Sequence, residues 1–236
     1  MSITSQQRHT IDCIVAIFET GRLPSSASYA TCAILKDGAG ISYGKHQCTD
    51  KAGSLDLVVK RYIELGGQHA AALQPYLPYL AENRSTRENP SGPWSAETQA
   101  LVNLLKQAGA DPKMKQAQDE VFDKNYWTPA ATQCKEMGLV TALAHAVVYD
   151  TCIHSGPGGV AKIRAKFAAS PPAKGGDEKE WVRQYLQARE EWLLSSANPI
   201  VRKTTYRMDA LQSVAASGNW DLNLPLTVRG VTIPAA

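Results

Sequence analysis

The stretch PAATQCKEMGLVTALAHAVVYDTCI, residues 129–153, decides the fold class of this chain. It is the longest apolar stretch with a helical pattern, and it predicts a central core helix. A break is expected near Gly138, because glycine readily ends a helix. The segment GPGG, which starts at Gly156, is expected to close the helix. A core helix of this kind favours a mainly helical fold.

The N-terminal part predicts a second important helix, with a small β element after it. Apolar residues recur at helical spacing at Ile11, Ile14, Val15 and Phe18. The pattern predicts an amphipathic helix whose apolar face ends beside Glu19, with Gly21 and Pro24 as stop signals. Residues 33–47 contain short apolar pieces separated by Asp-Gly and Gly, which indicates a small hairpin or irregular sheet.

Capping residues indicate where the remaining helices begin. Further helices are expected after Ser54 as N-cap, after Ser95, at Asp111-Pro112, at Asp177 with Glu180, and after Pro199. The helix after Ser54 is expected to end at Gly66-Gly67, and residues 226–233 (LTVRGVTI) to form a closing hairpin. The segment 75–93 is rich in Pro, Asn and Ser, which predicts a loop or linker with at most a short turn of helix, and we expect it to connect two lobes with a cleft between them. The fold class is thus α+β and mainly α, in a single domain over 1–236.

Composition excludes several classes of protein. The chain of 236 residues is 44% hydrophobic and 20% charged, and 25 cations against 22 anions leave a net charge of +3. These are the values of an ordinary globular protein, and the mild charge does not call for nucleic acid. No apolar run approaches the roughly 20 residues that span a membrane. The N-terminus shows no secretory signal, so we expect synthesis in the cytoplasm and a non-classical route to a target outside it.

The cysteines point to buried thiols and to no metal. There are five of them, an odd number with no CxxC pair: Cys13, Cys32, Cys48, Cys134 and Cys152. This pattern disfavours a zinc site or a disulfide framework and favours free, buried side chains. No cofactor is implied by any motif.

Glu19 and Asp37 are the candidate catalytic residues. Inverting hydrolysis of a glycosidic bond needs one protonated carboxyl for the leaving oxygen and one ionised carboxyl to activate water. A Glu at the end of an apolar helix suits the acid, and an Asp in an open, glycine-rich turn suits the base. Asp-Gly is also the commonest hairpin turn signal, so spacing alone favours Asp37 as a turn residue over a catalytic base.

Six segments, in order along the chain, resemble one enzyme family. They are IFET (17–20), KDGAGISYG (36–44), QAQDEVFDKNYWTPAATQCKEMG (116–138), VVYDTCIHSGPGG (147–159), PPAKGGDEKEWVRQYLQARE (171–190) and GNWDLNLPL (218–226). Together they are similar to glycoside hydrolase family 46, the chitosanase family of inverting, lysozyme-like enzymes. The resemblance implies a lysozyme-like, two-lobed fold with a substrate cleft. It implies that Glu19 is the general acid, that Asp37 is the general base, and that Ser42 helps to place the attacking water.

The same resemblance implies a network that supports the acid. Family members hold the general acid with a buried Arg-Asp-Arg set, which corresponds here to Asp150, Arg189 and Arg207. A buried carboxylate is tolerated when it is paired, and Arg can orient a carboxylate through two hydrogen bonds. The alternative is that both arginines are charges on helix surfaces.

Two departures from the family pattern concern the substrate. Ala39 occupies a position where the family usually has Arg, and Ser54 stands where an Asp contacts the amino group of a sugar. We take Ser54 and Tyr43 as candidate substrate-binding residues. A net positive chain fits an anionic cell-wall glycan better than cationic chitosan, so the sequence favours peptidoglycan, with chitosan as the alternative. A peptidoglycan hydrolase delivered as an antibacterial effector would need an immunity partner.

Two other classes of function compete with this interpretation. A thiol hydrolase would use Cys48 with His46 or Cys152 with His154, although neither cysteine lies at a predicted helix N-terminus. A sugar-binding module would use aromatic residues for stacking: Tyr43, Trp94, Tyr126, Trp127, Trp181 and Trp192. His145, on the apolar helix, is expected to be a hydrogen-bonded core residue.

Overall fold

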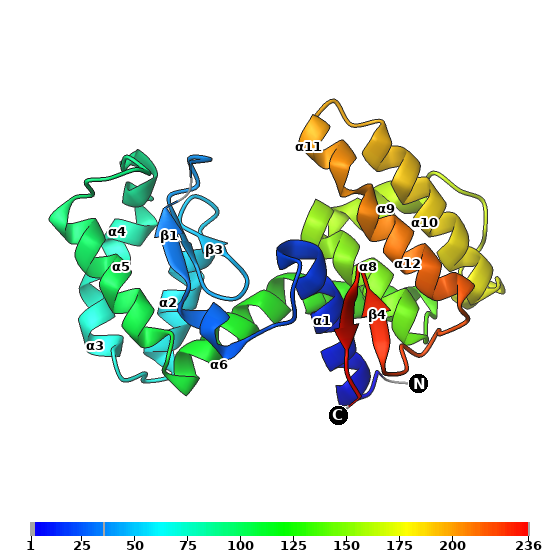
Figure 1. Cartoon of the computed structure of the whole chain (residues 1–236), viewed down its shortest axis with the longest axis horizontal. Helices are drawn as coiled ribbons and strands as arrows, with labels where there is room; N and C mark the ends of the chain where they lie inside the picture. The colour runs from blue at the N-terminus through cyan, green and yellow to red at the C-terminus, as the bar shows by residue number, and fades with distance from the viewer. Residues whose placement is uncertain (1–2, 35, 236) are drawn as a thin grey trace. The chain divides into compact units, whose positions relative to one another are not determined.

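The apolar stretch at residues 129–153 forms two helices in the computed structural model of the chain (Figure 1). Helix α7 (Thr128–Met137) ends where Gly138 takes the left-handed conformation at φ 72°, and α8 (Ala142–Ser155) follows. Every residue from Ala142 to Cys152 is buried, so α8 is enclosed on all sides, including its polar residues His145, Asp150 and Thr151. The predicted core helix with a break near Gly138 is confirmed.

The chain forms two units, and the structure describes residues 3–34 and 36–235. We call residues 1–23 and 126–236 the α8 unit. Besides α7 and α8, its elements are α1 (Ser5–Thr20), α9 (Gly158–Arg164), η5 (Pro172–Lys174), α10 (Glu178–Leu194), α11 (Pro199–Arg202), η6 (Lys203–Thr205), α12 (Tyr206–Ala216), β4 (Leu226–Val228) and β5 (Val231–Ile233). Helix α8 contacts α1, α7, α9, α10 and α12, which makes it the centre of this unit. Strands β4 and β5 pair antiparallel and form the predicted closing hairpin.

We call residues 24–125 the sheet unit. Its elements are η1 (Ser26–Ala30), β1 (Cys32–Ile34), β2 (Ile41–Tyr43), β3 (Cys48–Thr49), α2 (Ser54–Glu64), α3 (Ala70–Leu73), η2 (Gln74–Tyr76), α4 (Leu77–Ala81), η3 (Arg84–Arg87), α5 (Ala96–Ala108) and α6 (Pro112–Phe122), and the π-helical turn η4 (Asp123–Trp127) leaves it. The antiparallel sheet has the order β1-β2-β3. Its buried side chains pack with those of α2, α5 and α6 in one core. A mainly helical fold with a small sheet is therefore confirmed.

Side-chain caps begin several helices where the sequence predicts them. Ser95 accepts a hydrogen bond from the Thr98 amide, and Asp111 and Asp177 cap α6 and α10 in the same way. The prediction for α2 is wrong by one residue. Gly53, in the left-handed conformation, is the N-cap, while the Ser54 hydroxyl binds the backbone of Thr49.

The predicted lobe connection at residues 75–93 needs correction. This segment lies inside the sheet unit, where it forms η2, α4 and η3, and the chain passes between units near residues 23–24 and 125–126 instead. Its polar composition hides a buried part: Tyr79 and Leu80 are 2% and 1% exposed, and Ser85 is fully buried. Composition alone does not show which residues of a Pro-rich segment enter a core.

All five cysteines are buried and free, as expected. In the described part of the chain, no helix has the length and apolar character that a membrane crossing requires.

Candidate active site

Glu19 stands at the C-terminal end of α1. Thr4 begins the helix through a capping box with Gln7, and Gly21 ends it in the left-handed conformation at φ 73°. The neighbouring Phe18 is buried, whereas the side chain of Glu19 is 42% exposed. The helix therefore anchors its apolar face in the core and presents the carboxylate at its edge.

A buried ion network holds this carboxylate. Glu19 Oε1 accepts a hydrogen bond from Arg207 Nη2 at 2.6 Å, and Arg207 Nη1 donates to Asp150 Oδ1 at 2.6 Å. Asp150 Oδ2 lies 2.7 Å from Arg189 Nη1. Asp150 and Arg189 are fully buried, and Arg207 is 3% exposed. The structure thus brings together the three residues that the resemblance indicates, and they are not helix-surface charges.

The charges in the network outweigh the effect of burial. Burial alone would raise the pKa of Asp150, but Arg189 and Arg207 lower it below its ordinary value. Burial would likewise lower the pKa of Arg207, but the carboxylates of Asp150 and Glu19 raise it. With Glu19 ionised, the set of two carboxylates and two guanidinium groups is neutral.

A second contact positions the end of α1, and sequence reasoning missed it. The Tyr206 hydroxyl donates to the Phe18 carbonyl oxygen at 2.8 Å. The guanidinium of Arg229, at the tip of the β4–β5 hairpin, stacks 3.7 Å from the centroid of the Tyr206 ring. Tyr206 directly precedes Arg207 in the sequence. These two adjacent residues therefore hold the Phe18 backbone and the Glu19 side chain at the end of α1.

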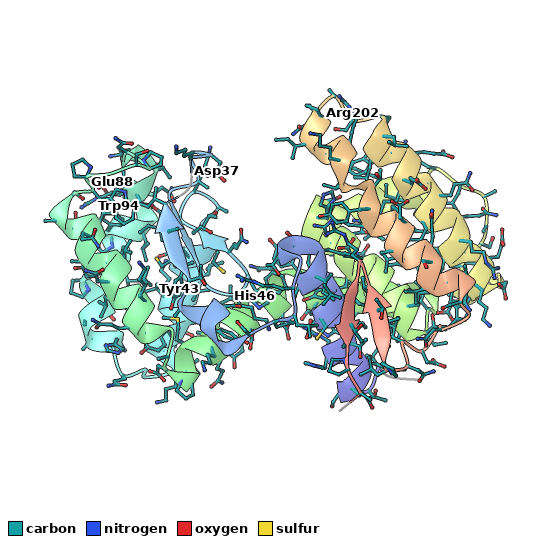
Figure 2. All side chains as sticks on the ribbon, viewed as in Figure 1. Asp37, Tyr43, His46, Glu88, Trp94 and Arg202 are labelled. Carbon is teal, nitrogen blue, oxygen red and sulfur yellow. The ribbon has the colours of Figure 1, made fainter. Side chains whose placement is uncertain are left out.

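Asp37 lies at the tip of the loop between β1 and β2, in the sheet unit (Figure 2). The side chain is exposed, and its Oδ1 accepts a hydrogen bond from the Ala39 amide at 3.0 Å. Gly38 and Gly40 have φ values of 73° and 72°, which favour glycine. At Gly40 there is also no room for a Cβ, because it would collide with the hydroxyl of Ser85. The loop is therefore a defined turn that leaves its carboxylate open to water.

Ser42 and Tyr43 lie on β2, directly after this loop. Ser42 pairs with Ala33 and Thr49 in the sheet and is 7% exposed. Tyr43 is fully buried, and its hydroxyl donates to the Leu105 carbonyl oxygen at 2.7 Å. The expectation that Tyr43 contacts substrate is corrected, because strand alternation turns this ring into the core.

Ser54 and Ala39 have structural contacts of their own. The Ser54 hydroxyl accepts from the Thr49 amide at 2.9 Å and joins β3 to the start of α2. The Ala39 carbonyl oxygen accepts from the Lys51 amide at 3.1 Å. Both contacts tie the segment after β3 to its neighbours. Ser54 therefore already has an internal role, whatever it contributes to substrate binding.

The thiol alternative has no support in the structure. Burial raises the pKa of Cys48 and of Cys152 to about 11 each, whereas an activated thiolate needs a lowered pKa. Burial and the charges of Arg207 and Arg189 lower the pKa of His154 to about 4. Among residues 3–34 and 36–235, no group of three or more His, Cys, Asp or Glu side chains is arranged to hold a metal ion.

Of the six candidate stacking residues, Tyr43 and Trp181 are buried, and Trp94, Tyr126, Trp127 and Trp192 are partly buried. Trp181 is fully buried, and Trp127 is partly buried between the Arg8 guanidinium, 3.9 Å from its ring centroid, and the edge of Tyr149. His145 is buried on α8 and its Nδ1 donates to the Thr141 carbonyl oxygen at 3.0 Å, as expected of a core histidine. A binding module built on stacked aromatics is therefore not favoured.

Comparisons with known proteins extend over nearly the whole chain. The sequence profile of glycosyl hydrolase family 46 matches residues 13–226. A chitosanase of Bacillus subtilis (strain 168) is 31% identical, over 96% of this chain and 83% of that protein. The native chitosanase of Bacillus subtilis MY002 superimposes with a TM-score of 0.80 at 28% identity, over 100% of both chains. The chitosanase of Gynuella sunshinyii, solved in complex with chitotetraose, superimposes with a TM-score of 0.78 at 29% identity, over 98% of both chains.

Proposed function

Since this chain belongs to glycosyl hydrolase family 46 and is a glycoside hydrolase, we propose that it cleaves the β-1,4 bonds of chitosan, a polymer of glucosamine, by inversion. The observation that carries the proposal is the likeness to chitosanases over nearly the whole chain, and Glu19 and Asp37 lie within the range 13–226 that the family profile matches. Glu19 belongs to the α8 unit and Asp37 to the sheet unit.

In this proposal Glu19 protonates the leaving oxygen. Arg207 binds Oε1 of the carboxyl group, which leaves Oε2 to carry the proton. As the proton moves to the leaving oxygen, Glu19 becomes a carboxylate beside a guanidinium that is already in place. Because Arg207 is held by Asp150, its charge needs no reorganisation during the reaction, which is the condition for effective electrostatic stabilisation.

Asp37 acts as the base that takes a proton from the attacking water. Its side chain is exposed to water, and the Ala39 amide fixes one of its two oxygens. The second oxygen is then free to receive the proton. Ser42, which follows the loop on β2, is proposed to help orient this water.

Chitosan now replaces peptidoglycan as the favoured substrate. The relatives and structural neighbours described above are chitosanases, and the earlier preference rested on net charge. The sheet unit holds 11 of the 25 cations and 11 of the 22 anions, so its formal charge is zero and the net +3 belongs to the α8 unit. There, Arg189 and Arg207 are buried around Asp150. Net charge therefore does not describe the surface around Asp37, and the expected immunity partner finds no support.

The decisive experiment offers the purified protein chitosan hexamers and peptidoglycan sacculi in parallel. We expect mass spectrometry to find shorter glucosamine oligomers, with no soluble muropeptides from the sacculi. Proton NMR of the first products should show the α-anomer, because inversion of a β-bond gives an α-product. Release of muropeptides with intact hexamers would refute chitosan as substrate, and β-anomers as first products would refute inversion.

A further inference from the structure

A buried pair of polar residues lies beneath the Asp37 loop and has no part in the mechanism described above. Asp50, after β3, and Ser85, in η3, are both fully buried. Asp50 Oδ2 accepts hydrogen bonds from the Ser85 amide at 3.1 Å and from the Ser85 hydroxyl at 2.5 Å. Thirty-five positions of sequence separate the two residues, so the pair is a product of the tertiary fold.

The Asp50–Ser85 pair is also hydrogen-bonded to the backbone at the end of the Asp37 loop. The Ile41 amide donates to Ser85 Oγ at 2.8 Å. An amide can only donate, so the Ser85 oxygen accepts in this bond and its own proton points to Asp50. The hydroxyl is thereby fixed in one orientation, and the hydrogen bonds run from the Ile41 amide through Ser85 to the carboxylate of Asp50.

Two backbone contacts complete the attachment of the loop. The Asp50 amide donates to the Ile41 carbonyl oxygen at 3.0 Å, and the Lys51 amide donates to the Ala39 carbonyl oxygen at 3.1 Å. Between these points lies Gly40, at which a Cβ would strike the Ser85 hydroxyl. Residues 39–41 are thus held on both sides, and the Ala39 amide in turn binds Asp37 Oδ1 at 3.0 Å.

This arrangement is costly for stability. Within the described part of the chain, Asp50 Oδ1 is buried and has no hydrogen-bond partner. A buried carboxylate without full pairing opposes folding, and an apolar residue of similar size would avoid that cost. Burial accordingly raises the pKa of Asp50 above its ordinary value. The presence of this destabilising carboxylate is explained if its hydrogen bonds are needed to hold the exposed loop in a fixed position.

We propose that Asp50 and Ser85 are positioning residues, which fix the Ala39–Ile41 segment and through the Ala39 amide hold the Asp37 carboxylate in its reactive orientation. The inference rests on the proposed role of Asp37 as the base. Neither residue touches substrate in this scheme. Their effect belongs to the turnover step, because Asp37 binds the attacking water rather than the sugar chain.

Steady-state kinetics on chitosan hexamers test the inference. For Ser85→Ala and for Asp50→Ala we expect kcat to fall about 10- to 100-fold, the effect of displacing a catalytic group by about 1 Å, with KM changed less than about two-fold. Asp50→Asn should retain kcat within about three-fold, because its amide oxygen still accepts both hydrogen bonds from Ser85. The double variant, with both Ser85 and Asp50 changed to Ala, should have a kcat close to that of the single variants. The two residues act through the same hydrogen-bond chain, so their effects should not add.

Tyr62→Phe is the matched control. Tyr62 is fully buried in the same unit, and its hydroxyl binds Asp111 at 2.7 Å and the His69 amide at 2.9 Å. The control should lose stability in urea as Ser85→Ala does, yet keep kcat. Hydrogen exchange by NMR should also show faster exchange of the Ile41 amide in Ser85→Ala and not in the control.

Two outcomes separate this inference from the proposed function. If Asp37→Asn is inactive while Ser85→Ala keeps its kcat, the inference is wrong and the proposed function stands. If Asp37→Asn itself keeps its activity, the proposed function fails, and the positioning role fails with it. A loss in Ser85→Ala that Tyr62→Phe reproduces, or that appears equally in Asp50→Asn, would also overturn the inference, since general destabilisation would then explain it.

Discussion

In the α8 unit, a charged side chain holds Glu19, whereas in the sheet unit a backbone amide holds Asp37. Glu19 contacts Arg207, which is fixed by the buried Asp150. Asp37 contacts the Ala39 amide, in a loop that is attached to Asp50 and Ser85. The difference fits the two proposed tasks. The carboxylate that forms when Glu19 gives up its proton has a fixed cation beside it, whereas Asp37 keeps one side-chain oxygen for the proton that it accepts from water.

The largest effects are expected from the two carboxylates themselves. Glu19→Gln and Asp37→Asn should each lower kcat on chitosan hexamers by about 10²–10⁴-fold, the usual contribution of a general acid or base. Circular dichroism should show unchanged folding, because both side chains lie at the surface. Hydrolysis at the parental rate by either variant would remove that residue from the mechanism.

Asp150→Asn breaks the network of the α8 unit. It leaves the buried Arg189 without its counter-ion and leaves Arg207 with Glu19 alone, so we expect a loss of about 3–5 kcal/mol in the free energy of unfolding, measured in urea. Glu180→Gln is the control, because its ion pair with Arg183 is exposed and is expected to contribute about 0.5 kcal/mol. Equal midpoints for Asp150→Asn and the parent would show that the network does not stabilise the unit.

The two buried aspartates should respond to pH in opposite directions. Asp150 has a lowered pKa, so its contribution to stability is complete above its unfolded pKa and is lost as the pH falls through the folded pKa. Asp50 has a raised pKa, so its contribution is present below its unfolded pKa and is lost as the pH rises through the folded pKa. Urea unfolding of parent, Asp150→Asn and Asp50→Asn between pH 3 and pH 7 measures both slopes. The contrast is refuted if the two substitutions change the pH dependence in the same direction.

The smallest effect is expected from Arg229→Ala. Loss of its stacking on Tyr206 should lower stability by about 0.5–1 kcal/mol and kcat by less than about three-fold, because the Tyr206 hydroxyl still binds the Phe18 carbonyl oxygen. Arg164→Ala removes a similar contact with Phe167 and serves as the control, with no change in kcat. A larger kinetic loss in Arg229→Ala would give the hairpin a stronger role in holding the end of α1.

Local signals were sufficient for much of the fold. Gly138, Ser95, Asp111 and Asp177 act over one turn of chain, and the structure places helix ends or caps at each. Hydrophobic spacing also placed Glu19 at the end of α1. The same kind of signal was wrong for residues 75–93, because burial of part of that segment depends on what packs over it.

What the sequence by itself determined is therefore what depends on neighbouring residues: the helices, the turn that presents Asp37, and the family resemblance that runs along the chain. Only the tertiary structure decided which distant residues meet. Arg207 reaches both Asp150 and Glu19, and Ser85 lies under Gly40 while it binds Asp50. The physical reason is that buried charges and hydroxyls are stable only where partners from other segments satisfy them, and no local pattern records those partners.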